Sequence, residues 1–202
     1  MWDLKIGQKI SILAQGSLPL SVGCVTLSAE GRTLASNVKG IIKVCDLETL
    51  KQKLTFKAHI ATITFLAISR DGQTLASSSY DKTIKIWDLR KVQEIGLIAE
   101  SNCNGRSLAI SPDGQTLAYV SIDVLKVWDC KTRHKIHAIK RGEFWSVAFS
   151  PDEQSLASSA EDGLIQTWDL TTGQEIQTLV GHSLCVKSIA ISANRQTLVR
   201  GR

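Results

Sequence analysis

His59, Ser77 and Asp81 are the residue types of a hydrolytic triad, and they lie near one another in the sequence. Within hydrogen-bonding distance, they would act as general base, nucleophile and orienting acid. Trp87 follows shortly after, and its indole N–H can only donate a hydrogen bond. Because these residues fall in different short segments of the chain, their role depends on the elements that position them.

A second group, Cys130, His134 and His137, has the residue types of a zinc site. His134 and His137 have opposite parity on a predicted strand, so their side chains point to opposite faces and do not close on one ion. The five cysteines include no Cys-x-x-Cys pair, and their odd number favours reduced thiols over a disulfide framework. We therefore expect no metal and no cofactor.

The elements are set by a repeat that runs along the whole chain. A Trp-Asp ending, with Cys in place of Trp once, recurs at steps of 43, 42, 41 and 40 residues. The endings begin at Trp2, Cys45, Trp87, Trp128 and Trp168. A period of about 40–45 residues with this ending is typical of four-stranded propeller blades. We predict an all-β propeller and one domain, 1–202, with repeats that end near 3, 46, 88, 129 and 169.

The clearest repeat has short runs of alternating β-branched and apolar residues between turn residues. Its predicted strands are 63–69, 74–79, 83–88 and 93–98. Its first turn ends on Gly72, which tolerates a positive φ. Glu153 and Arg195 replace this glycine in two other repeats, so we expect those turns to be less stable.

Two segments, 112–118 (PDGQTLA) and 83–89 (TIKIWDL), carry a specific resemblance. The chain resembles WD40-repeat proteins over essentially its whole length, and it is similar to the long, regular WD40 arrays of bacteria. This resemblance implies a β-propeller of about five repeats that serves as a non-catalytic scaffold or adaptor for protein–protein contacts. The partner would be a protein or peptide.

The resemblance also implies a structural role for the triad-like residues. His59, Ser77, Asp81 and Trp87 match the hydrogen-bonded tetrad that links the strands of a WD40 blade, and buried polar groups in such a chain satisfy one another. The fourth repeat keeps three members, which are Ser158, Asp162 and Trp168, with Lys140 in place of the histidine. The third repeat keeps Trp128, and the first has Cys45 at the tryptophan position. The second repeat should therefore be the most rigid and the first the softest.

WD40 proteins often bind partners on their top face, at residues that enter each first strand or precede the tetrad aspartate. By repeat alignment these are Ser21, Gly23, Thr62, Thr64, Tyr80, Asn104, Arg106, Glu143, Trp145, Glu161, Cys185 and Lys187. Aromatic residues and arginine dominate binding hot spots, so Tyr80, Arg106 and Trp145 are the strongest candidates. The alternative for Trp145 is packing between blades, and for the other two it is an ordinary solvated side chain.

The termini do not complete a blade by this alignment. The chain holds five repeats less one hairpin and half a strand. Either the termini share a closing blade, with Trp2 from one end and His182 from the other, or the chain is a truncated fragment of a longer WD40 protein without independent activity. An unclosed ring leaves open blade edges, which favour self-association.

Composition excludes several other classes of protein. The chain is 43% hydrophobic and 21% charged, with no apolar run long enough to cross a membrane and no signal-peptide core, so we expect a cytoplasmic protein. The net charge of +5 is scattered, which disfavours nucleic-acid binding. Glu143 and Glu161 are neighbours by alignment, but no nucleophile and base accompany them, which disfavours an enzyme.

Overall fold

The computed structural model describes residues 2–3, 8–9, 23–99, 105–121, 123–180, 184–192, 194 and 196–201. All regular elements in these residues are β-strands, as the period of the apolar residues predicts. They form four antiparallel four-stranded sheets, which we call the first to fourth blades, and two separate hairpins.

The blades follow one another in chain order. The first blade is β3 (Val25–Leu27), β4 (Thr33–Val38), β5 (Ile41–Asp46) and β6 (Lys51–Lys57). The second is β7 (Ile63–Ile68), β8 (Thr74–Ser79), β9 (Thr83–Asp88) and β10 (Gln93–Ala99). The third is β11 (Ser107–Ile110), β12 (Thr116–Val120), β13 (Leu125–Asp129) and β14 (Lys135–Ile139). The fourth is β15 (Phe144–Phe149), β16 (Ser155–Ala160), β17 (Ile165–Asp169) and β18 (Glu175–Leu179). The hairpins are β1 (Trp2–Asp3) with β2 (Gln8–Lys9), and β19 (Ser188–Ile191) with β20 (Leu198–Gly201).

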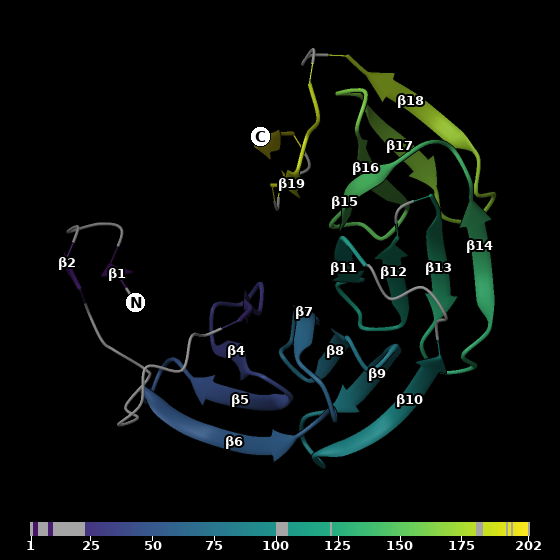
Figure 1. Cartoon of the computed structure of the whole chain (residues 1–202). Helices are drawn as coiled ribbons and strands as arrows, with labels where there is room; N and C mark the ends of the chain where they lie inside the picture. The colour runs from purple at the N-terminus through teal and green to yellow at the C-terminus, as the bar shows by residue number, and fades with distance from the viewer. Residues whose placement is uncertain are drawn as a thin grey trace.

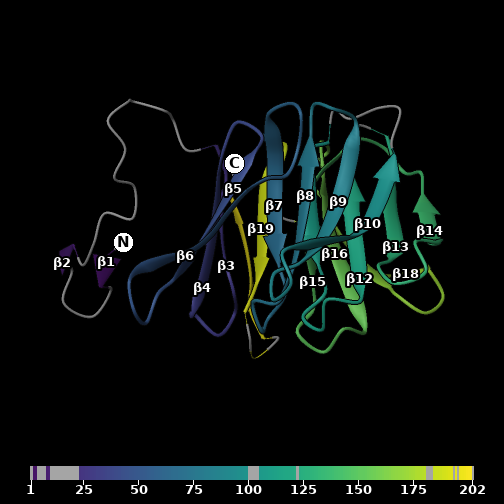
Figure 2. The ribbon, with the colours of Figure 1, turned by 90° about the horizontal axis from the view of Figure 1, so that it is seen from below.

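The blades stand around a common centre, with β7, β11, β15 and β19 inside and β6, β10, β14 and β18 outside (Figure 1). Seen from the side, the strands run between two rims of turns and loops (Figure 2). The described strands form an arc, and the β19–β20 hairpin and the first blade stand at its two ends (Figure 1). This arrangement confirms the predicted WD40-type blades, and the strands of the second repeat agree with prediction to within one residue.

The first turn of the second, third and fourth blades is built by a serine and an aspartate. In the second blade, Ser69 donates its hydroxyl proton to Asp71 at 2.6 Å, and Asp71 accepts the Gln73 N–H at 2.9 Å. Gly72 closes the turn with a φ of +70°. The fourth blade repeats the serine–aspartate bond, but Glu153 holds a φ of +62° where the second blade has glycine. The predicted weakness of this turn therefore has a structural cause.

Glu153→Gly should raise the free energy of unfolding by about 0.5–1 kcal/mol, because a left-handed conformation costs a non-glycine residue roughly 1–2 kcal/mol. The glycine's greater freedom in the unfolded chain offsets part of this gain. Burial and the nearby Asp113 carboxylate also raise the pKa of Glu153, so removal of its carboxyl relieves an unfavourable neighbour. Urea unfolding measures the gain. The control, Gln154→Gly, should destabilise the same turn, and a loss of stability in Glu153→Gly would contradict the argument.

In the four blades, the aspartate that ends the third strand holds the turn to the fourth strand. Asp129 accepts the backbone N–H groups of Lys131 at 2.9 Å and Thr132 at 2.6 Å. Asp46 and Asp169 accept the equivalent pairs of N–H groups in their own blades. The recurrence of aspartate in the sequence therefore reflects a repeated turn.

The core lies between blades. Ala76, Ile84 and Ile86 of the second blade pack against Leu108 and Leu117 of the third, and all five side chains are buried. Equivalent clusters join the first blade to the second, the third to the fourth, and the fourth to the β19–β20 hairpin. Each blade is thus stabilised mainly by its neighbours, as expected of a repeat protein.

The two terminal hairpins are not joined by a sheet in the described residues. Among the described residues β1 is paired with β2 and β19 with β20, and no pairing of β1 with β20 is described there. His182, which the sequence places in that blade, lies outside the described residues. Closure of the ring and the single-domain range 1–202 stay predictions.

Candidate functional site

The predicted tetrad of the second blade is assembled in the structure. His59 Nδ1 lies 2.9 Å from Asp81 Oδ2, and His59 Nε2 lies 2.7 Å from Ser77 Oγ. The Trp87 indole donates to the same Ser77 oxygen at 2.9 Å. Thr83, which the sequence analysis missed, donates its hydroxyl proton to Asp81 Oδ1 at 2.6 Å. The threonine immediately before the Ile-Lys-Ile-Trp-Asp run was the available signal.

This geometry resembles a catalytic triad, but it is sealed from solvent. The His59 side chain is fully buried and Ser77 is 0% exposed, so no substrate can reach the hydroxyl. Ser77 also accepts the Trp87 N–H, which a nucleophile would have to release before attack. The arrangement therefore links β8, β9 and the turn between them to the segment that enters the blade, and it has no access for a reaction.

The other blades keep only parts of this network. In the fourth, Trp168 donates to Ser158 at 2.8 Å, whereas Asp162 is exposed and accepts the Leu164 N–H within its own turn. In the third, Tyr119 takes the place of the serine, and Trp128 Nε1 is buried without a hydrogen-bond partner among the described residues. Ser158 and Trp168 therefore behave as the repeat predicts, while Asp162 does not join them.

The first blade uses a different polar residue. Asn37 is fully buried, accepts the Cys24 N–H at 2.7 Å and donates to the Ile63 carbonyl of the second blade at 3.3 Å. It therefore ties two blades together at a place where the tetrad is missing.

The zinc-like residues have separate environments, although His134 does not lie on the predicted fourth strand with His137. His137 lies 2.9 Å from the Leu170 carbonyl oxygen of the neighbouring blade, while His134 precedes β14 and is exposed. Cys130 is buried, and this burial raises the pKa of its thiol to about 12. In the part of the chain that the structure describes, no group of three or more His, Cys, Asp or Glu side chains is placed to hold a metal ion.

The predicted partner-binding residues meet where the third and fourth blades adjoin. The Arg106 guanidinium lies over the Trp145 ring, 3.9 Å from its centroid, and donates to Glu143 Oε2 at 2.8 Å. It also donates to the Phe144 carbonyl oxygen at 3.2 Å. These contacts leave the Arg106 side chain only 19% exposed, so it is held in place and is no ordinary solvated side chain. Trp145 is half-buried, and its Nε1 has no hydrogen-bond partner among the described residues.

Charged residues from two further segments surround this pair. Burial raises the pKa of the Cys185 thiol; Lys187 and Arg106 act in the opposite direction, and Glu161 and Glu143 add to the rise. The Glu161 N–H donates to the Glu143 carbonyl at 2.9 Å, and Lys187 and Glu161 act on the same thiol as the Arg106–Glu143 pair. Glu161 and Lys187 are exposed. We call Arg106, Glu143, Trp145, Glu161 and Lys187 the Arg106 rim.

A shallow hollow adjoins the Arg106 rim. Its volume is about 430 Å³, and it is lined by Gly142, Glu143, Ala160, Glu161 and Asp162. The hollow therefore offers carboxylates beside a fixed guanidinium and an aromatic ring.

Tyr80 lies on the same edge of its own blade. Its N–H donates to the Thr62 carbonyl at 3.0 Å, as the Glu161 N–H donates to the Glu143 carbonyl at 2.9 Å. Tyr80 is 65% exposed, and no described contact joins it to the Arg106 rim. Two other top-face candidates, Ser21 and Asn104, lie outside the described residues.

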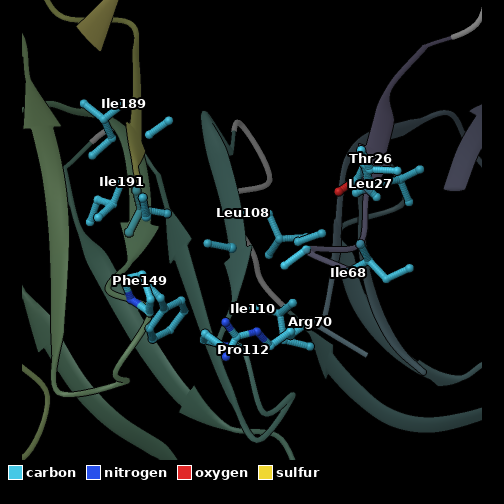
Figure 3. A pocket seen from close by; sticks show the side chains of 18 residues that line it. Thr26, Leu27, Ile68, Arg70, Leu108, Ile110, Pro112, Phe149, Ile189 and Ile191 are labelled. Atoms are coloured by element: carbon cyan, nitrogen blue, oxygen red, sulfur yellow. The ribbon is translucent and has the colours of Figure 1, made fainter. Parts of the chain in front are cut away.

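A larger cavity of about 500 Å³ lies at the centre of the arc. Side chains from all inner strands point into it, among them Leu27, Ile68, Ile110, Phe149 and Ile191 (Figure 3). Among the described residues, its lining is apolar except for a few polar groups such as Arg70, and no acid, base and nucleophile converge there. The cavity follows from the strands standing around an axis, and it offers no chemistry.

Comparison with known proteins shows what the chain is similar to. The model of the "WD domain, G-beta repeat" matches residues 50–88 and 128–169. Apoptotic protease-activating factor 1 of Rattus norvegicus is 28% identical over 185 residues, which are 86% of this chain and 15% of the relative. Autophagy-related protein 16 of Arabidopsis thaliana is 25% identical over 205 residues, 100% of this chain and 32% of the relative.

A third relative, the small ribosomal subunit protein RACK1 of Schizosaccharomyces pombe, is 28% identical over 138 residues, 62% of this chain and 43% of the relative. The chain thus spans less than half the length of each of these three proteins. Since they come from a mammal, a plant and a yeast, the similarity to bacterial arrays stays a prediction. No helix in the described residues is long and apolar enough to cross a membrane.

Proposed function

We propose that this chain, whose repeats match the WD40 family model at residues 50–88 and 128–169, is a non-catalytic interaction module that binds a protein or peptide partner at the Arg106 rim. WD40 repeats typically act as protein-interaction scaffolds. The observation that carries the proposal is the fixed Arg106–Trp145 stack with its Glu143 ion pair.

The geometry of the stack suits binding. Arginine and tryptophan are enriched among residues that dominate interface energies. Arg106 is held by three contacts before any partner arrives, so less side-chain freedom is lost on association. Glu161 and Lys187 are exposed beside it and supply charges of both signs, which favour an oriented encounter.

Other features support a scaffold over an enzyme. The Ser77–His59–Asp81 group is sealed, and the central cavity is apolar. Cys24, Cys45, Cys130 and Cys185 are free thiols, which supports a cytoplasmic location for the module.

Trp145→Ala should weaken partner binding by more than about 1 kcal/mol, on the order of fivefold in Kd, because the variant removes the ring on which Arg106 is stacked. The partner is first isolated by cross-linking in cells, then purified and titrated by calorimetry. Because Trp145 is half-buried, we expect a small loss of stability, about 1 kcal/mol.

Lys187→Glu separates binding from folding. Reversal of the Lys187 charge should reduce the rate at which the partner associates. Because Lys187 is exposed, the melting curve should not change. Lys135→Glu on the outer strand β14 is the control, since Lys135 is also exposed but distant in the repeat from the rim. If Trp145→Ala lowers stability by several kcal/mol and both rim variants spare binding, Trp145 is a packing residue and the proposed rim is wrong.

A further inference from the structure

The two ends of the arc expose apolar residues that every internal junction buries. Val25 on β3 is 59% exposed, whereas its register equivalents in the next three blades and in β19 are 9%, 8%, 5% and 7% exposed. These equivalents are Leu66, Leu108, Val147 and Ile189. Leu27, two residues further on the same face, is 53% exposed. We call Val25 and Leu27 the entry face, because the equivalent residues receive the preceding blade.

The opposite end of the arc carries the complementary surface. Val199 on β20 is 61% exposed, whereas its equivalents Ala35, Ala76, Ala118 and Ala157 are between 0 and 1% exposed. Ala190, paired with Val199 across the hairpin, is also exposed. We call Ala190 and Val199 the exit face. Each internal junction packs an exit face on an entry face, so the two ends of the arc are the two halves of a junction.

The terminal hairpins are also complementary halves of one blade. β1 pairs with β2 as Trp2 with Lys9 and Asp3 with Gln8. The outer hairpin of the second blade has the same spacing, Trp87 with Glu94 and Asp88 with Gln93.

β19–β20 has the pairing of an inner hairpin, since Ile191 pairs with Leu198 as Ile68 pairs with Leu75. In that blade Leu75 then pairs with Trp87 and Thr74 with Asp88. The free edge of β20 is therefore in register to take β1, with Leu198 opposite Trp2.

From these two observations we propose that the chain self-associates head to tail. The exit face of one copy packs on the entry face of a second copy, whose β1–β2 hairpin pairs with the β20 edge of the first. One contact thus buries both apolar faces and completes a four-stranded blade. A second copy is the fitting occupant because it presents the entry face and the β1–β2 hairpin together, as each internal junction does. The two ends of a single chain stand apart across the opening of the arc (Figure 1).

Such a contact is heterologous, which gives it a specific signature. In a pair of copies, the first keeps a free entry face and the second keeps a free exit face, so association continues into rings or chains. Leu27→Glu introduces a charge on the entry face only, and Val199→Glu introduces one on the exit face only. Each variant alone should be monomeric, because a buried unpaired carboxylate is costly. An equimolar mixture retains one good entry face and one good exit face, and it should form 1:1 dimers that grow no further.

Sedimentation velocity from about 1 to 50 μM tests this on the full chain. We expect the wild type to increase in mass with concentration and each variant to weaken association at least tenfold. Ile176→Glu is the matched control, since Ile176 is 58% exposed but lies on the outer strand β18. Circular dichroism confirms that each variant is folded, and Val25→Glu replaces Leu27→Glu if that variant is not.

Three outcomes would overturn the proposal. A wild-type chain that is monomeric at every concentration points to closure within one chain. Loss of association in Ile176→Glu but not in the face variants points to pairing of outer strands. A mixture of Leu27→Glu and Val199→Glu that stays monomeric excludes the head-to-tail contact.

Discussion

His59→Leu should lower the free energy of unfolding by about 3 kcal/mol or more, a large part of the stability of a typical domain. The His59 side chain is fully buried, and it hydrogen-bonds both Asp81 and Ser77. Leucine leaves the Asp81 carboxylate, itself only 5% exposed, without its ring partner and the Ser77 hydroxyl with one partner fewer. Chemical denaturation of the purified chain measures the loss.

Two tryptophan variants separate the contribution of the indole hydrogen bond from that of ring packing. Trp87→Phe removes the indole N–H that donates to Ser77 and should cost about 1–2 kcal/mol beyond the change in packing. Trp128→Phe removes an N–H that has no partner among the described residues, so it loses no hydrogen bond and should cost less. Cys45→Ala, at the tryptophan position of the first blade, should also cost less than His59→Leu. Equal losses in Trp87→Phe and Trp128→Phe, or at His59 and Cys45, would contradict a structural tetrad.

Acid should destabilise the fold in two steps. Burial lowers the pKa of His59, against the opposing effect of Asp81, so the unfolded chain binds a proton at about pH 6.5 that the folded chain excludes. Stability is therefore lost as pH falls below about 6.5. The hydrogen bond from Arg90 lowers the pKa of Asp88 to about 2. A lowered aspartate pKa contributes stability above the unfolded value of about 3.9, and this is lost as pH falls from about 5 to about 2.

The turn aspartates of the other blades contribute to the second step. Hydrogen bonds from the backbone of Thr49, Thr132 and Thr172 lower the pKa of Asp46, Asp129 and Asp169, respectively. Urea unfolding at pH 7, 5.5, 4 and 2.5 measures both steps. His59→Leu should abolish the first step, and Asp88→Asn should reduce the second while it lowers stability at pH 7. Stability that is flat from pH 7 to pH 2.5 would contradict both assignments.

Much of the fold is contained in the repeat itself. The strands of the second blade were predictable because the Trp-Asp spacing and the alternation of apolar residues act within one repeat. The tetrad was predicted from the resemblance to WD40-repeat proteins. The role of the Trp-Asp aspartate, which accepts N–H groups two and three residues further on, is equally local. Residues that act within one turn or one blade are therefore visible in the sequence.

Contacts between blades were not visible in the same way. The repeat aligns Arg106 with Trp145 only as equivalents on neighbouring blades, and it does not show that the guanidinium lies on the ring. Asp162 has the tetrad residue type, but without a histidine partner it turns to its own loop. The exposure of Val25 and Val199 likewise depends on which blade is next to each of them in space, a property of the whole arc.

The Arg106 rim is tested most directly by photo-cross-linking from single positions in cells. A photoreactive amino acid is placed at Lys187 on the rim, or at Ile176 on the outer strand, and the adducts are identified by mass spectrometry. We predict one dominant protein adduct from Lys187 that is absent from Ile176 and is lost when Trp145→Ala is added. Equal adducts from both positions, or a Lys187 adduct that persists in Trp145→Ala, would contradict a partner-binding site at the rim.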